Sequence, residues 1–134
     1  MTRPVVVVPH DPAWVAAFEA LRAVYVASLG DLALAIHHVG STSVPGLAAK
    51  PIIDVDVEIR SREILPSVVR ALAALGYRHE GDLGVHGREA FAPESDDVPR
   101  DGSGRRWPEH HLYVCASDSP ELRRHLVFRD WLRA

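Results

Sequence analysis

Two short stretches of the sequence carry residues suited to holding phosphate and a divalent metal ion. The pair Gly40-Ser41 ends an apolar run, and a glycine there lets an anion come close to exposed backbone N–H groups. Asp54 and Asp56 alternate with apolar residues, so both carboxylates point to the same side of an extended strand. Paired carboxylates suit Mg²⁺, which completes its coordination with water and substrate phosphates. The combination predicts phosphoryl or nucleotidyl transfer.

The loop between these two stretches adds candidates for phosphate contacts. Thr42 follows the Gly-Ser pair, and Lys50, the only lysine of the chain, lies just before the segment with Asp54. A compact ammonium group binds phosphate as a point charge. An ordinary loop lysine is an equally good interpretation of Lys50.

The histidines offer a second route to a metal site. His37-His38 and His110-His111 are adjacent pairs, and neighbours in a strand point to opposite faces, so neither pair can chelate one ion. His111 can join Asp54 and Asp56 if its strand lies beside theirs. Such a triad makes a transition metal as plausible as Mg²⁺.

Hydrophobic periodicity and turn residues predict the elements that position these groups. Helices are expected over residues 11–29, 64–75 and from 119 to the end, and strands over residues 33–39, 52–59, 88–92 and 111–115. The last two strands suit an antiparallel hairpin. The order of elements predicts an α+β domain whose mixed β-sheet is covered by helices.

Two segments are expected to lie outside this regular framework. Residues 3–9, apolar and bounded by prolines, predict either a short edge strand or an extended arm. Residues 93–109 combine prolines, glycines and charges without periodicity, which predicts a mobile loop.

Composition narrows the class of protein. The chain has 134 residues and a formal net charge of -3, which predicts one domain over residues 1–134 and no nucleic-acid partner. Its single cysteine cannot form an internal disulfide. No membrane span or leader is expected, so the location is predicted to be cytoplasmic. The final helix is expected to be cut short, either by the natural terminus or by truncation.

The tract HVGSTSVPGLAAKPIIDVDV resembles the signature of the GrpB family, which is placed in the nucleotidyltransferase-like superfamily. Other segments that resemble family features are Asp11-Pro12-x-Trp14, Leu75-Gly76-Tyr77, Arg88-Glu89-x-Phe91, His111-Leu112-Tyr113-Val114 and Leu126-x-Phe128-Arg129-Asp130-x-Leu132. The resemblance implies a nucleotidyltransferase-like sheet. It matches the hydrophobic-Gly-Ser and Asp-x-Asp elements of that superfamily to Gly40, Ser41, Asp54 and Asp56.

The resemblance also implies a third acidic group, because active relatives of this type usually have one on a later strand. The candidates are Glu89, Glu58 and a substitution by His111. Glu89 is the preferred catalytic partner of Asp54 and Asp56, with an Arg88–Glu89 pair that only shapes the sheet edge as its equal alternative.

The function that these features favour is transfer of a nucleoside monophosphate from a nucleoside triphosphate, with Mg²⁺ or another divalent cation, to a small-molecule or protein acceptor. In that hypothesis Gly40, Ser41, Thr42 and Lys50 hold phosphate, and Arg88 contacts the phosphate tail or the acceptor. The main alternative is a catalytically silent domain of the same fold that binds a nucleotide, another phosphorylated ligand or a partner. A metal-binding structural module built on Asp54, Asp56 and His111 is a third hypothesis.

Overall fold

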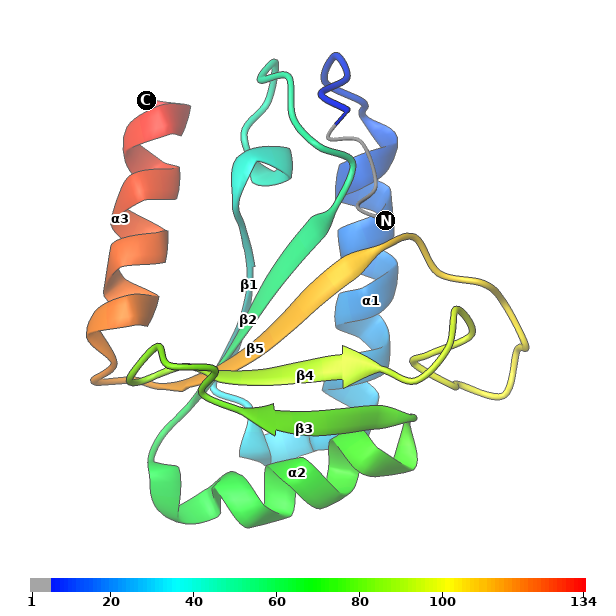
Figure 1. The fold of residues 1–134 in the computed structure, drawn as a ribbon, viewed down its shortest axis with the longest axis vertical. Helices are drawn as coiled ribbons and strands as arrows, with labels where there is room; N and C mark the ends of the chain where they lie inside the picture. The colour runs from blue at the N-terminus through cyan, green and yellow to red at the C-terminus, as the bar shows by residue number, and fades with distance from the viewer. Residues whose placement is uncertain (1–5) are drawn as a thin grey trace.

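A computed structural model describes residues 6–134 as a mixed sheet with helices on both faces (Figure 1). The helices are α1 (Ala13–Leu29), α2 (Leu65–Ala74) and α3 (Pro120–Arg133). The strands are β1 (Ala35–Val39), β2 (Ile53–Ile59), β3 (Tyr77–Gly81), β4 (Glu89–Pro93) and β5 (His110–Ala116). The predicted α+β class is confirmed.

The strands follow the spatial order β1-β2-β5-β4-β3. β2 is antiparallel to β1 and parallel to β5, while β4 is antiparallel to both β5 and β3. The expected antiparallel pairing of the residue 88–92 and 111–115 segments is therefore present. β2 lies between β1 and β5 in the sheet. Its side chains point alternately to the two faces of the sheet.

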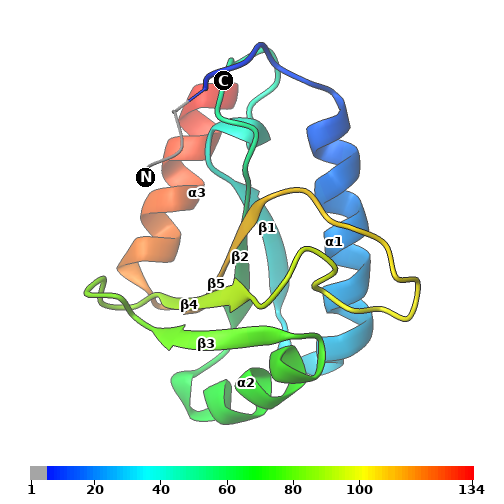
Figure 2. The same ribbon diagram turned by 45° about the vertical axis from the view of Figure 1, so that its right-hand side comes forward.

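One face of the sheet forms the hydrophobic core. Ile53, Val55, Val57 and Ile59 of β2 are buried there, and α1 and α2 pack on this side, whereas α3 lies across the opposite face (Figures 1 and 2). We call that opposite face the acid face, because Asp54, Asp56 and Glu58 point to it. The register places His37, Val39, His111 and Tyr113 on the acid face as well.

Helix α1 and the 3-10 turn after it span Ala13–Leu32, 20 residues that are long and apolar enough, by length and composition alone, to cross a membrane. No membrane span was expected from the sequence. Its apolar stripe is accounted for by packing, since Trp14, Phe18, Leu21, Tyr25 and Leu29 are all buried in the core.

β3 was not expected from the sequence, because Tyr77–Gly81 has no apolar alternation. In the structure Tyr77 is the buried residue of this strand. It is an edge strand whose pairing with β4 decides its conformation. Its Tyr77 hydroxyl accepts a hydrogen bond from the Tyr25 hydroxyl (2.6 Å) and donates one to His110 Nε2 (2.7 Å). This buried chain ties α1 and β3 to the beginning of β5.

Residues 94–109 form a loop between β4 and β5, as expected, but the loop is anchored by two buried apolar side chains. Val98 is fully buried and Trp107 is 7% exposed, and Trp107 Nε1 donates a hydrogen bond to Pro99 O (2.8 Å). At the N-terminal segment, Val8 forms a single bridge with Ala49. Residues 3–5 of the predicted strand or arm lie outside the described residues.

Candidate active site on the acid face

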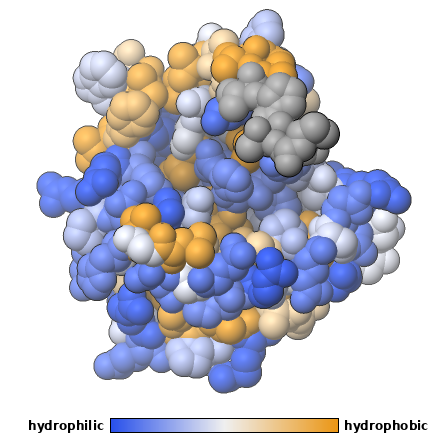
Figure 3. Space-filling view, in the orientation of Figure 1, coloured by the Kyte–Doolittle hydropathy of each residue, from blue (hydrophilic) through white to orange (hydrophobic). Residues whose placement is uncertain are grey.

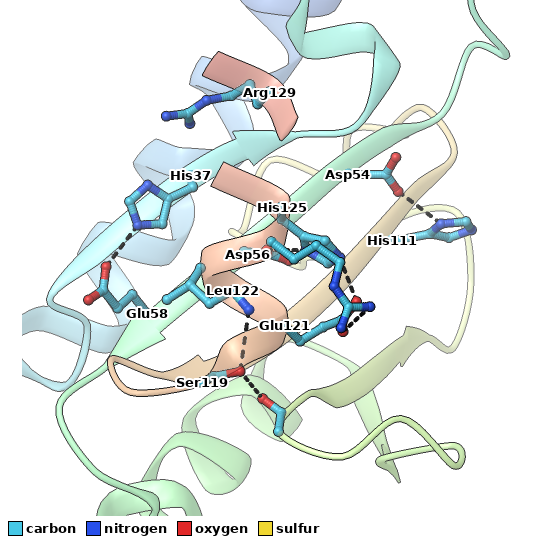
Figure 4. Close-up of polar contacts among 12 residues, drawn as sticks. His37, Asp54, Asp56, Glu58, His111, Ser119, Glu121, Leu122, His125 and Arg129 are labelled. Atoms are coloured by element: carbon cyan, nitrogen blue, oxygen red, sulfur yellow. Dashed lines mark hydrogen bonds and ion pairs between the residues drawn. The ribbon is translucent and has the colours of Figure 1, made fainter. Parts of the chain in front are cut away.

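Asp54 and Asp56 lie on the acid face of β2, and each carboxylate meets a histidine from another element (Figure 4). Asp54 Oδ1 accepts a hydrogen bond from His111 Nδ1 of β5 at 3.0 Å. Asp56 Oδ2 accepts one from His125 Nδ1 of α3 at 2.6 Å. The parallel pairing of β2 with β5 explains the first contact, because Asp54 and His111 are register partners.

Asp56 has the more unusual environment of the two. Its side chain is fully buried, and its Oδ1 atom has no hydrogen-bond partner. A buried carboxylate oxygen without a partner is energetically unfavourable, so this atom is suited to a cation. The described residues contain no group of three or more His, Cys, Asp or Glu that could hold a metal. A divalent ion here therefore fits only if water and phosphate oxygens complete its coordination, as they do for Mg²⁺.

His125 connects the acid face to helix α3. Its Nε2 lies 3.1 Å from Glu121 Oε1, one turn earlier, while Nδ1 donates to Asp56. The hydrogen bond to Asp56 is the main cause that raises the pKa of His125, and the charge of Glu121 adds to it. A protonated His125 would therefore offset the negative charge of Asp56. No part of the site was predicted on α3, although the i, i+4 spacing of Glu121 and His125 was a usable signal.

Gly40 brings the backbone of the loop against Asp54. It has φ +72° and ψ -177°, a combination essentially restricted to glycine. A Cβ built on Gly40 would lie 2.3 Å from Asp54 Oδ2. Glycine is therefore required here both by the backbone conformation and by the approach to Asp54.

The residues after Gly40 form a 3-10 turn, Ser41–Ser43, in which the predicted phosphate ligands differ. Ser41 is exposed, whereas Thr42 is buried. The Thr42 hydroxyl donates to Ile52 O at 3.2 Å and accepts from His38 Nε2 at 3.0 Å. The Thr42 hydroxyl, expected to hold phosphate, therefore makes hydrogen bonds within the protein that stabilise the loop.

Helix α3 holds the same loop through two arginines. Arg129 donates to His38 O (3.3 Å), and Arg133 Nε donates to Ser43 O (3.0 Å). With the contact between His125 and Asp56, three polar contacts fix α3 over the acid face. Leu122 is the buried residue of this helix, so polar contacts carry much of its attachment.

We expect His38 to make the loop less stable in acid. Burial is the main cause, and the charge of Arg133 the second, that together lower the pKa of His38 to about 4. Because the unfolded chain binds this proton near the ordinary histidine pKa of about 6.5, the stability contributed by neutral His38 is lost as the pH falls from 6.5 towards 4.

The measurement is urea unfolding at pH 7 and pH 5. His38→Gln keeps an N–H donor for Thr42 but does not titrate, so its free energy of unfolding should fall less between these pH values than that of the wild type. His86→Gln, at an exposed position, serves as the control and should fall as the wild type does. An equal fall in His38→Gln would contradict the assignment.

A pocket of about 350 Å³ opens beside the two aspartates. It is lined by Val39, Gly40, Asp54, Arg88, Tyr113, Arg124, His125 and Phe128. The Arg88 guanidinium lies over the Tyr113 ring, 4.2 Å from its centroid, and the buried Nε of Arg88 has no hydrogen-bond partner. Asp54, Arg88 and Arg124 thus line one space that is large enough for a small phosphorylated ligand.

The other predicted residues lie away from this pocket. Glu89 pairs with Val114 in the register of β4 and β5, which places it on the core face, where His79 Nε2 lies 3.0 Å from its carboxylate. It therefore does not join Asp54 and Asp56. Lys50 is exposed and does not line the pocket. Glu58 shares the acid face, but its carboxylate contacts His37 and Ser117.

Both the sequence and the fold have known relatives. The family described as GrpB protein matches residues 4–134. The UPF0157 protein YqkA of Bacillus subtilis (strain 168) is 36% identical over 132 residues. The aligned region covers 98% of this chain, and the chain spans 36% of the length of YqkA.

Two solved structures share the fold. The crystal structure of the conserved protein GrpB from Enterococcus faecalis matches with a TM-score of 0.76 and 34% identity, over 96% of this chain and 72% of that chain. The Cid1 poly(U) polymerase matches with a TM-score of 0.52 and 13% identity, over 93% of this chain and 37% of that chain. The second likeness shows a nucleotidyltransferase-like fold and nothing finer.

Proposed function

Because this chain belongs to the GrpB protein family, and because its fold is nucleotidyltransferase-like, we propose that the acid-face pocket binds a nucleoside triphosphate with Mg²⁺. Asp54 and Asp56 would hold the ion. The observation that carries this proposal is the unpaired Oδ1 of the fully buried Asp56, next to a second carboxylate in a pocket with two arginines.

Different residues of the pocket would contact different parts of the ligand. Arg88 and Arg124 line it together with Asp54, and their guanidinium groups suit phosphate oxygens. Gly40 brings the backbone close to the same space. His111 positions the Asp54 carboxylate through its 3.0 Å hydrogen bond. When bound, Mg²⁺ would offset phosphate charge and assist the attacking and leaving oxygens.

The reaction proposed for this site is nucleotidyl transfer. An acceptor oxygen forms a bond to the α-phosphorus, the bond from that phosphorus to the bridging oxygen breaks, and pyrophosphate leaves while the acceptor hydroxyl gives up its proton to solvent water. Arg88 and Arg124 would then stabilise the charge that develops on the phosphates.

One observation favours a second candidate, a nucleotide-binding domain without turnover. Among residues 6–134, Asp54 is the only carboxylate that lines the pocket, with Asp56 buried behind it. Glu89, the expected third acid, lies on the other face of the sheet. The two candidates share the binding site and differ in whether chemistry follows.

Calorimetry with ATP in the presence and absence of Mg²⁺ tests the shared part. We expect binding that requires Mg²⁺ and is lost in Asp54→Asn. Incubation with ATP labelled at the α-phosphate and a set of candidate acceptors then tests turnover, which both Asp54→Asn and Asp56→Asn should abolish. Binding without transfer supports the silent domain. No heat with Mg²⁺ and ATP rejects both candidates.

A further inference from the structure

The part of α3 that lines the pocket ends in an aromatic residue. Arg124, His125 and Phe128 line it with Asp54 and Arg88, and their i, i+1, i+4 spacing puts them on adjoining parts of one helix surface. His125 is engaged with Asp56, and Arg124 pairs with Glu121 at 3.2 Å. The apolar side chain of Phe128 can form neither a hydrogen bond nor an ion pair of this sort.

Phe128 is unusually exposed for a phenylalanine. The residue is 58% exposed, and within residues 6–134 no aromatic ring packs against it. Large aromatic residues are normally buried because of the apolar area that they withdraw from water. An open phenyl ring at the wall of a polar pocket is therefore available to a flat ligand group.

We propose that Phe128 is the surface on which the base of the bound nucleotide stacks, so that α3 supplies the base subsite of the pocket. This inference rests on the proposed function. The charged residues Asp54, Arg88 and Arg124 of the pocket suit the metal and phosphate end of a nucleotide and leave its planar end without a partner. Stacking on an aromatic side chain gives that end an apolar partner and tolerates any base, because every base has a π-face.

The attachment of α3 keeps Phe128 in place relative to the phosphate end. Arg129, the next residue, donates to His38 O, and Arg133 donates to Ser43 O. Both acceptors flank Gly40, whose backbone lies against Asp54. The helix that carries Phe128 is thus joined by hydrogen bonds to the chain before and after Gly40.

The same helix carries a wider apolar surface, which allows a discriminating control. Val127, Phe128 and Trp131 are all exposed, Trp131 by 72%, and apolar atoms are visible in the upper left of Figure 3, where α3 runs in Figure 1. Of these three, Phe128 lines the pocket. A base subsite requires Phe128, whereas a contact surface between protein chains would depend on Trp131 as well.

The test compares binding of ATP and of inorganic tripolyphosphate, each with Mg²⁺, by calorimetry. Phe128→Ala should weaken ATP binding about tenfold or more, the range that loss of a base stack gives, and should leave tripolyphosphate binding unchanged. Phe128→Tyr should restore ATP binding, since it keeps the ring. Trp131→Ala should leave both ligands unaffected.

Three outcomes overturn the inference. Equal weakening of ATP and tripolyphosphate by Phe128→Ala shows a general disturbance of the pocket. ATP binding unchanged by Phe128→Ala shows that the base lies elsewhere, while the proposed function stands. A monomer–oligomer equilibrium shifted alike by Phe128→Ala and Trp131→Ala, measured by sedimentation, shows that the surface joins protein chains. If the wild type binds neither ligand, the proposed function itself fails.

Discussion

Replacing Asp56 with asparagine should weaken Mg²⁺-dependent ATP binding by at least about a hundredfold, since loss of a supporting partner outside the coordination sphere already costs about ten- to hundredfold. Asp56 is fully buried, and its Oδ1 is the carboxylate oxygen of the site that has no hydrogen-bond partner. Asparagine has nearly the same shape, so the fold should be kept. Its neutral amide can still meet His125, but it cannot supply a carboxylate to the ion.

Glu58→Gln is the matched control for this substitution. Glu58 lies on the same strand and the same face, two residues along, and its carboxylate contacts His37 and Ser117 instead of the pocket. We expect it to leave Mg²⁺ and ATP binding at the wild-type level. Calorimetry gives the affinities, and circular dichroism shows that each variant is folded.

A different result would assign Asp56 a structural role. If the aspartate serves only to hold α3, then Asp56→Asn and His125→Gln should both lower the free energy of unfolding, because each weakens the same 2.6 Å hydrogen bond by removing one of its charged partners. Mg²⁺-dependent ATP binding would then be unchanged in Asp56→Asn, and this outcome contradicts the metal assignment.

Strand β2 shows how much of the fold the sequence could predict. Its alternation has a period of two, which requires an extended conformation with one apolar and one acidic side. The structure confirms both, with Ile53–Ile59 as the strand and the apolar side chains in the core. The GrpB resemblance and the α+β class, which depend on this strand and its neighbours, are confirmed as well.

Local pattern could not predict the face on which Glu89 lies. Which side of β4 meets the core depends on its pairing with β5, a tertiary property. Glu89 and Phe91 share one side, and the large apolar ring of Phe91 is buried in the core, 3% exposed. The burial of Phe91, which the pairing of β4 with β5 decides, therefore places Glu89 on the core face.

Helix α3 was predicted as an element but not as part of the site. Its contacts with Asp56, His38 and Ser43 join residues that are 69, 91 and 90 positions apart. Spacing rules within one helix do not predict such contacts. The outcome for residues 93–109 has a related cause. The segment between β4 and β5 is a loop, as its composition predicts, but Val98 and Trp107 are buried by packing against distant parts of the chain.

We expect Gly40→Ala to be the most damaging substitution in the loop. The added Cβ would lie 2.3 Å from Asp54 Oδ2, and the backbone conformation at Gly40, with φ +72°, disfavours any other residue. Backbone strain of this kind costs about 1 to 3 kcal/mol, and relief of the collision adds to it. The free energy of unfolding should therefore fall by roughly 3 kcal/mol or more.

Gly46→Ala separates the two causes, because Gly46 also has a positive φ of +80° but no atom within 4 Å of an added Cβ. It should lose only about 1 to 2 kcal/mol from the left-handed backbone, as measured by urea unfolding, and should bind Mg²⁺ and ATP as the wild type does. Gly40→Ala should also lose binding while still folded, because the methyl group displaces the Asp54 carboxylate. Equal destabilisation of the two variants, or intact ATP binding in Gly40→Ala, would show that the close approach of Gly40 to Asp54 contributes nothing to the site.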